Sequence, residues 1–200
     1  ADGSPDLIIG STRIVGSGGI IAQDVRWTSG EIGTVVTAVN TLSIEGSSPR
    51  ILDTDSELVN QGTAVWQDGD ILGDASSLIT NTGSFEVQAS GRAITDGTFD
   101  NQGTLIGNAA STTQLPLLVN SGTVQVLQGT LIFDNFVQVA PTAVLSLEGG
   151  NVASDLGFDI QDGLGHALLR GSGIEVIWLS GRQSTATTQR GTELRVAEIL

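Results

Sequence analysis

The chain has 200 residues, of which 39% are apolar, and its 22 acidic and eight basic side chains give a formal net charge of −14. The apolar content excludes a wholly disordered chain, and the negative charge makes nucleic acid and anionic membrane surfaces poor partners. The absence of Cys excludes disulfides and thiolate chemistry, and no apolar run approaches the roughly 18 residues that a membrane span needs.

The chain begins with ADGSPDLIIG, which lacks a start Met, a basic region and an uninterrupted apolar run. Such a beginning is expected of a processed chain or of a segment of a larger protein, and it is compatible with a removed signal peptide. Glycine is frequent, at 27 residues, which is typical of short strands joined by tight turns. Residues 1–35 are predicted to form irregular first coils of the repeat that follows.

A unit of about 20 residues recurs through the middle of the chain. It is visible in LVNQGTAVW, ITNTGSFEV, FDNQGTLIG and LVNSGTVQV, which share an Asn, then a Gly two places later, then Thr or Ser. The pattern extends upstream to Asn40, where Leu42 replaces the Gly and Ser43 keeps the hydroxyl. The repeated positions are Asn40, Asn60, Asn81, Asn101, Asn120, Gly62, Gly83, Gly103 and Gly122.

Apolar residues also recur within each unit, at two places before the Asn and at four and six places after it. The fifth place after the Asn tends to be polar, so each unit has the period of 2 that indicates a strand with one buried face. A β-rich unit of this length buries its apolar face only by stacking on its neighbours. The sequence therefore predicts an all-β fold, a single-stranded parallel β-helix (β-solenoid) with coils of about 20 residues.

The asparagines are predicted to lie at a corner of each coil. Asn tolerates left-handed backbone geometry, and its amide can hydrogen-bond to the Asn of the next coil. The glycines would give the sharp corner. A second strand in each coil is indicated by Ile71 and Leu72, by Ala93 and Ile94, and by residues 129–133, while the third wall of the coil is less legible.

Beyond Asn120 the repeat is weaker. Residues 136–152 still give two alternating strands around a turn, residues 171–181 give another, and the end of the chain gives a last one, with a polar loop at 181–191. We therefore expect one β-solenoid domain over residues 1–200, with regular coils at 36–152 and less regular final coils and a loop at 153–200.

The segments FDNQGTLIGNAAS, VNSGTVQVLQGTLIF and FVQVAPTAVLSLEGGNV resemble the repeats of large bacterial surface β-helix proteins, of the filamentous haemagglutinin and autotransporter-passenger kind. The resemblance covers about residues 36–152. It implies a secreted or cell-surface rod used in adhesion, in a biofilm matrix or as a spacer. Its partners would be host or matrix carbohydrate or protein, or other domains of a larger surface protein.

Parallel β-helices also serve polysaccharide lyases and glycoside hydrolases, which place several carboxylates and a basic residue on one strand face. No Lys is present, and the single His, His166, has no partner motif and is predicted to be a packed or turn residue. Three tryptophans would be sugar-stacking platforms if exposed. We expect Trp66 and Trp178 in the core, whereas Trp27 has polar neighbours on both sides.

Calcium is the one cofactor that the sequence suggests. Asp68, Asp70 and Asp74 lie close together in DGDILGD and are weak candidates for oxygen ligands, and Asp159 with Asp162 is a weaker second pair. Asp and Gly are also common turn residues, and this simpler reading is favoured for both groups.

The sequence therefore predicts a non-enzymatic, secreted or cell-surface β-helix segment with an adhesive or spacer role. The first alternative is a carbohydrate-active enzyme, which requires three or more carboxylates that converge on one exposed wall beside an Arg. The second is a trimeric fibre of the phage type, for which a long exposed apolar wall would be the sign.

Overall fold

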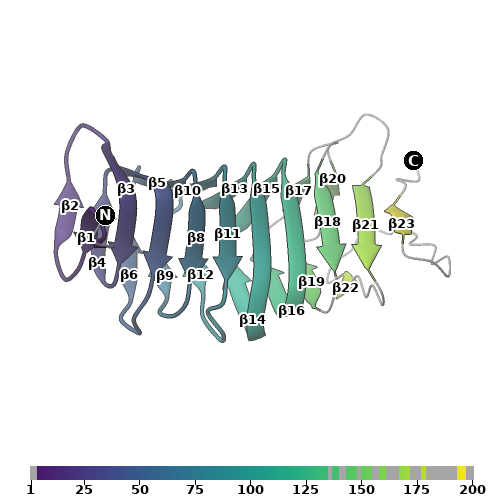
Figure 1. The fold of residues 1–200 in the computed structure, drawn as a ribbon. Helices are drawn as coiled ribbons and strands as arrows, with labels where there is room; N and C mark the ends of the chain where they lie inside the picture. The colour runs from purple at the N-terminus through teal and green to yellow at the C-terminus, as the bar shows by residue number, and fades with distance from the viewer. Residues whose placement is uncertain are drawn as a thin grey trace.

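The computed structural model describes residues 4–134, 137–139, 143–147, 150–154, 158–160, 167–171, 177–178 and 193–196. Every regular element in these residues is a β-strand, and the strands stack into an elongated rod (Figure 1). The rod is a β-solenoid of about seven turns, with a coil spacing of about 20 residues. The predicted all-β, parallel solenoid is thereby confirmed.

Each coil contributes to three walls. Wall A leads into the asparagine corner, and its strands pair in parallel along the rod. In order it contains residues 20–22 of β3 (Ile20–Trp27), residues 35–38 of β5 (Val35–Ile44), β7 (Glu57–Asn60), β10 (Leu78–Asn81), β13 (Thr98–Asn101), β15 (Leu117–Asn120), β17 (Val137–Val139) and β20 (Phe158–Ile160).

Wall B follows the corner, and its strands also pair in parallel. It contains β1 (Leu7–Ile9), the second halves of β3 and β5, β8 (Thr63–Trp66), β11 (Ser84–Val87), the first halves of β14 (Thr104–Leu115) and β16 (Thr123–Phe133), β18 (Val144–Leu147) and β21 (Ala167–Gly171). The last strand, β23 (Glu193–Val196), pairs with β21 in the antiparallel sense.

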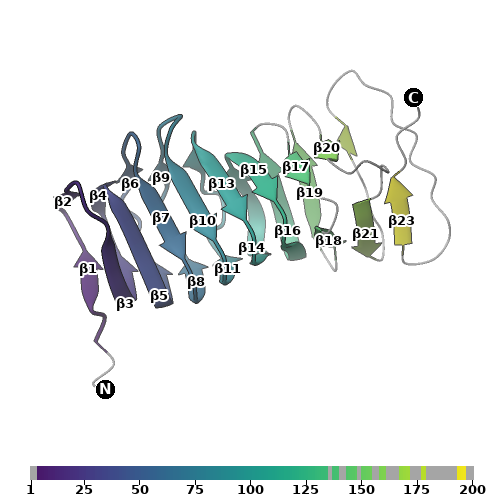
Figure 2. The same cartoon turned by 90° about the horizontal axis from the view of Figure 1, so that it is seen from above.

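Wall C closes the coil with short strands. It contains β2 (Arg13–Val15), β4 (Gly30–Gly33), β6 (Arg50–Leu52), β9 (Ile71–Leu72), β12 (Ile94–Thr95), the second halves of β14 and β16, β19 (Asn151–Ser154) and β22 (Ile177–Trp178). The second strand predicted for each coil is therefore wall C. Figure 2 shows the strands as successive, nearly parallel rungs from β1 to β21.

The core is a set of columns that run along the inside of the rod. Each column stacks equivalent apolar residues, as in Ile44, Trp66 and Val87, all fully buried. Phe85 and Phe99 meet edge to face, with ring centroids 5.1 Å apart and an interplanar angle of 89°, which is a favourable aromatic geometry. Each column runs through successive coils, so the apolar residues of one coil are covered by the equivalent residues of the coils on either side.

The register confirms four of the five predicted asparagine positions and corrects the fifth. Asn60, Asn81, Asn101 and Asn120 are direct partners in the ladder. The partner of Asn60 in the preceding coil is Ala38, while Asn40 is exposed. The placement of Asn40 in the corner column is therefore wrong by two residues. The aligned hydroxyl is Thr41 rather than Ser43, because the apolar alternation of β5 runs through Leu42 and Ile44, which pair with Ala64 and Trp66.

Candidate functional site

The corner asparagines form a buried chain of side-chain hydrogen bonds. Nδ2 of Asn60 donates to Oδ1 of Asn81 at 2.8 Å, Asn81 donates in the same way to Asn101 at 2.8 Å, and Asn101 donates to Asn120 at 2.7 Å. Each Nδ2 also donates to the backbone carbonyl three places beyond the next Asn, as from Asn81 to Thr104 at 3.0 Å. The predicted amide ladder is present, and its asparagines are at most 3% exposed.

The ladder ends at Asn60. Its Oδ1 is buried and has no hydrogen-bond partner among the described residues, because Ala38 occupies the equivalent position in the preceding coil. A buried acceptor without a donor is unfavourable. The ladder therefore fixes the register of four coils and leaves the earlier coils to be aligned by the core and by other contacts.

The glycines of the corner are required for a reason other than the predicted one. The corner asparagines and glycines are absent from the positive-φ residues in the described part of the chain. Instead, a Cβ on Gly83 would lie closer than 3.0 Å to backbone atoms of Gly62 and Gln61 in the previous coil, and Gly103 and Gly122 are placed alike. Glycine is needed because the backbones of successive coils approach closely here.

Asn81→Ala is expected to lower the free energy of unfolding by about 2 to 3 kcal/mol, because it removes three hydrogen bonds and leaves Oδ1 of Asn101 buried without a donor. Urea denaturation followed by circular dichroism measures this change. Asn40→Ala is the matched control and should be nearly neutral, since Asn40 is exposed. Equal losses in the two variants would contradict the corrected register.

Arg50 is a fully buried cation that the sequence reasoning did not single out. Its guanidinium donates only to backbone carbonyls: Nε to Trp27 at 3.0 Å, one terminal nitrogen to Ser48 at 3.2 Å and Asp68 at 2.9 Å, and the other to Gly46 at 2.8 Å and to Glu45. These carbonyls belong to three successive coils. Arg50 therefore clamps the corner between walls B and C.

Two effects act on the pKa of Arg50 in opposite directions. Burial lowers the pKa of Arg50, and the nearby negative charges of Asp68, Glu45 and Asp70 act in the opposite direction. Its wall-C neighbours are Gly30, which has no side chain, and Ile71. The sequence contained an indication of this burial. Arg50 lies two residues before Leu52, so in a strand both side chains point inward. An arginine at an inward position needs hydrogen-bond acceptors inside the protein.

The three calcium candidates lie around β9 but do not share one site. Asp68 and Asp70 precede this strand and Asp74 follows it, and their carboxylates accept hydrogen bonds from different partners. Oδ1 of Asp68 accepts from the Gly69 amide at 2.7 Å and from Nε of Arg92 at 2.6 Å. Oδ1 of Asp70 accepts from the Ala93 amide, and Oδ1 of Asp74 from Ser76.

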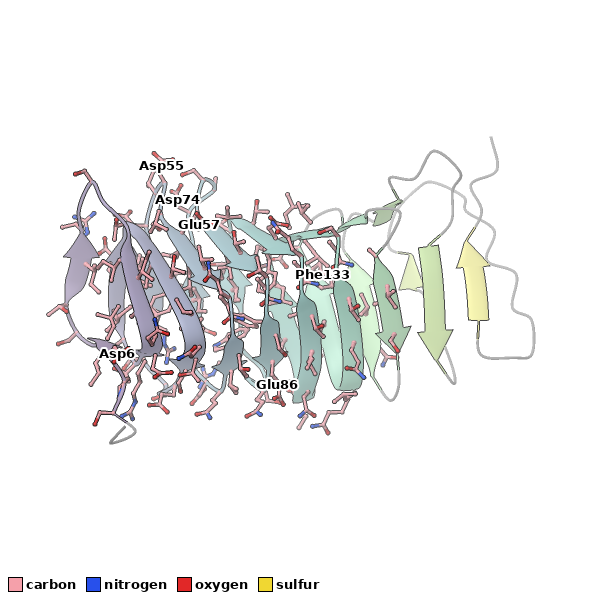
Figure 3. All side chains as sticks on the ribbon, turned by 45° about the horizontal axis from the view of Figure 1, so that its top comes forward. Asp6, Asp55, Glu57, Asp74, Glu86 and Phe133 are labelled. Atoms are coloured by element: carbon pink, nitrogen blue, oxygen red, sulfur yellow. The ribbon has the colours of Figure 1, made fainter. Side chains whose placement is uncertain are left out.

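No group of three or more metal-binding side chains converges within the described residues. Figure 3 shows Asp55, Glu57 and Asp74 along one edge of the rod, and Asp6 and Glu86 along the opposite edge. Calcium binding stays a prediction. A rise in melting temperature with millimolar Ca²⁺ that is lost in Asp70→Asn would establish it.

Among the described residues, Arg13 on wall C is the one arginine that forms ion pairs with two carboxylates. Arg13 bridges Glu31 in the next coil and Asp53 in the one after. The pKa of Asp53 is lowered, first by the hydrogen bond from the Thr54 amide and then by that from Arg13. A carboxylate held in its charged form is a poor general acid. The group links three coils on the outside of the rod.

Stability is expected to fall in acid partly through Asp68. Its pKa is lowered below the ordinary 3.8, first by the Gly69 amide and then by Arg92. Because the folded state resists protonation, this carboxylate stabilises the protein above about pH 4, and the contribution is lost as pH falls through the lowered pKa. Melting temperatures from pH 6 to pH 2 should fall less steeply in Asp68→Asn than in the wild type. Parallel curves would contradict this assignment.

The tryptophans are structural where their side chains are described. Trp27 and Trp66 are both fully buried and share one core column with Ile44. The prediction that Trp66 lies in the core is confirmed, and Trp27 is buried as well, since its polar neighbours occupy outward or corner positions. Trp178 lies in β22 without a described side chain, and so does Asp159 in β20, whereas His166, Asp162 and the predicted loop at 181–191 lie outside the described residues.

None of the described residues belongs to a helix of the length and apolarity needed to cross a membrane. No family model matches the chain, and neither a curated protein nor a solved structure matches it. Functional assignment therefore rests on the chain's own residues.

Proposed function

We propose that this protein is a non-enzymatic structural rod, secreted or displayed at a cell surface, with an adhesive or spacer role. The observation that supports this most directly is the use of its buried polar groups. The side chains of the asparagine ladder and of Arg50 form hydrogen bonds that join one coil to the next. Such contacts stiffen a solenoid along its axis and leave its outer walls for partners.

The outer walls also favour this role. The described carboxylates that have partners accept hydrogen bonds from backbone amides, from arginines of neighbouring coils or from other polar side chains of the walls. A chain with an excess of acidic groups on its surface stays soluble and resists aggregation of exposed sheet, which suits an exported rod. The repeat resemblance to bacterial surface β-helix proteins agrees with this proposal and extends it to matrix carbohydrate or protein as partners.

The enzyme alternative has its best support at Arg13, Glu31 and Asp53, because these are two carboxylates beside an arginine on an exposed wall. Glycoside hydrolysis needs one carboxyl group that is protonated at working pH. Asp53 has the opposite perturbation, because its pKa is lowered.

The trimeric fibre alternative requires a long apolar wall. The large hydrophobic side chains exposed in the described part of the chain do not form a long wall: one lies in each of β1, β2, β3 and β16, and two are register neighbours in β6 and β9. They are Ile8, Val15, Ile21, Ile51, Leu72 and Leu127.

The test compares retention with turnover on the same panel of immobilised polysaccharides and matrix proteins. We expect the labelled chain to be retained on at least one surface with no release of reducing ends or unsaturated sugars. Turnover that disappears in Glu31→Gln or Asp53→Asn, while both variants keep the wild-type melting curve in circular dichroism, would establish the enzyme alternative. Absence of both retention and turnover would leave the spacer role.

A further inference from the structure

The asparagine ladder has a donor end and an acceptor end. Along it each Nδ2 donates to the Asn of the following coil, so Oδ1 of Asn60 is the acceptor that remains at the first position. The direction of the Asn60 amide is fixed, because its Nδ2 lies 2.9 Å from the carbonyl oxygen of Ser84, which can only accept. Turning the amide over would set its oxygen against that carbonyl. The acceptor end therefore faces the preceding coil, where Ala38 is the register partner of Asn60.

This acceptor is both polarised and enclosed. Hydrogen bonds that run in a chain polarise one another, so an amide that donates becomes a better acceptor at its oxygen. Asn60 stands at the beginning of a chain of four amides and is only 1% exposed. Its Oδ1 has no hydrogen-bond partner among the described residues. A buried acceptor of this kind needs a donor.

A second acceptor belongs to the same place in the coil. Each Nδ2 that donates to the next Asn also donates to the backbone carbonyl three places beyond that Asn. These carbonyls belong to Ser84, Thr104 and Thr123, at 2.9 to 3.0 Å. For position 38 the equivalent carbonyl is that of Thr63, because Thr63 and Ser84 are register partners. An amide at position 38 would therefore donate once to Oδ1 of Asn60 and once to the carbonyl of Thr63.

The space beside Ala38 suits one small donor. Ala38 is fully buried, and its side chain has three heavy atoms fewer than that of an asparagine. Its register partner in the coil before is Ala22, so the column begins with two small side chains. The missing amide group corresponds to about the share of one water molecule in the liquid, which is about 30 Å³. A buried water also needs at least two polar partners, and Asn60 and Thr63 supply them.

We propose that one buried water molecule is bound beside Ala38, where it donates one hydrogen to Oδ1 of Asn60 and the other to the carbonyl oxygen of Thr63. Its two O–H groups replace the two N–H groups of the missing amide, so the ladder begins with a water in place of a fifth asparagine. Both acceptors are neutral, which favours a neutral donor over a cation. A bridging water is nearly as favourable as a direct hydrogen bond. This inference does not depend on the proposed function.

Magnetic resonance of the unmodified chain tests the site directly. With methyl-labelled alanine, we expect a nuclear Overhauser signal from a long-lived water to the methyl group of Ala38. The control is the methyl group of Ala64, which is also fully buried but is stacked between Leu42 and Phe85 in an apolar column. It should receive no such signal, because an apolar column offers a water no partners.

Two substitutions of nearly the same shape separate the need for donors from the need for volume. Ala38→Asn should raise the melting temperature by about 2 to 4 °C, because an amide donates directly to Asn60 and Thr63 and the water is released. Ala38→Leu should lower the melting temperature, because it displaces the water and leaves both acceptors without the donor. The water signal should vanish in both variants.

Absence of the water signal at Ala38 overturns the proposal, and this measurement holds even where a variant does not fold. A higher melting temperature for Ala38→Leu would also overturn it, because filling a dry cavity with an apolar side chain stabilises a protein. A lower melting temperature for both variants would show that neighbouring side chains already fill the space, and no site for a water would remain.

Discussion

Gly83→Ala is expected to lower the free energy of unfolding by about 4 kcal/mol or more. The added Cβ would lie closer than 3.0 Å to backbone atoms of Gly62 and Gln61. Neither neighbour can rotate away, because the Ser84 amide holds the two coils together through its hydrogen bond to the Gly62 carbonyl at 2.8 Å. Relief therefore requires that the coils separate at the corner, which also disturbs the asparagine ladder.

Urea denaturation of wild type and variant measures this loss, and Gly18→Ala is its control. A Cβ on Gly18 would meet no atom within 4 Å, and its φ is not in the left-handed region. The control should change stability by no more than about 0.5 kcal/mol. Similar unfolding midpoints for the two variants would show that the corner is looser than its geometry indicates.

Arg50→Leu is expected to cost about 3 to 5 kcal/mol, because five hydrogen bonds to backbone carbonyls are lost and the remaining acceptors are partly buried. Arg50→Lys should recover little of this loss, since a single ammonium group cannot span carbonyls of three coils as a planar guanidinium does.

Thermal and urea melts of these variants, with Arg26→Leu as control, test the role of Arg50. Arg26 is half exposed and forms an ion pair with Glu45, and exposed ion pairs contribute little to stability. If Arg50→Leu were as stable as Arg26→Leu, water would satisfy the released carbonyls, and the clamp between walls B and C would be dispensable. Amide hydrogen exchange at residues 45–50 and 67–70 would locate the loosened corner.

Much of the fold could be predicted because a solenoid repeats its local rules. The same Asn, Gly and apolar positions recur in consecutive coils, so an error in one unit is corrected by the others. This repetition gave the strand period, the coil length and the pairing of Asn60 with Asn81. It failed at Asn40, where the Asn lies two places late and the glycine is absent. There the core alternation of β5 decides the register, since shifting a strand would expose its apolar face.

The candidate sites were less predictable for a different reason. Asp68, Asp70 and Asp74 are close in sequence, but they lie on both sides of β9 and do not form one group of metal-binding side chains among the described residues. Arg13, Glu31 and Asp53 are far apart in sequence, and the stacking of coils brings them together. Residues that are close in sequence can be distant on the wall of a solenoid, and residues of different coils can be neighbours there. The distance on the wall decides which charged side chains form ion pairs.

The β-solenoid, the asparagine column over four coils and the alternation of inward and outward residues could all be predicted from the amino-acid pattern, because these are local and periodic properties. Three features became clear only from the folded rod: Trp27 is buried, Arg50 joins three coils, and the corner glycines are required by close backbone contact. Each of these depends on the distance between residues in different coils, which is set by the stacking of the whole rod.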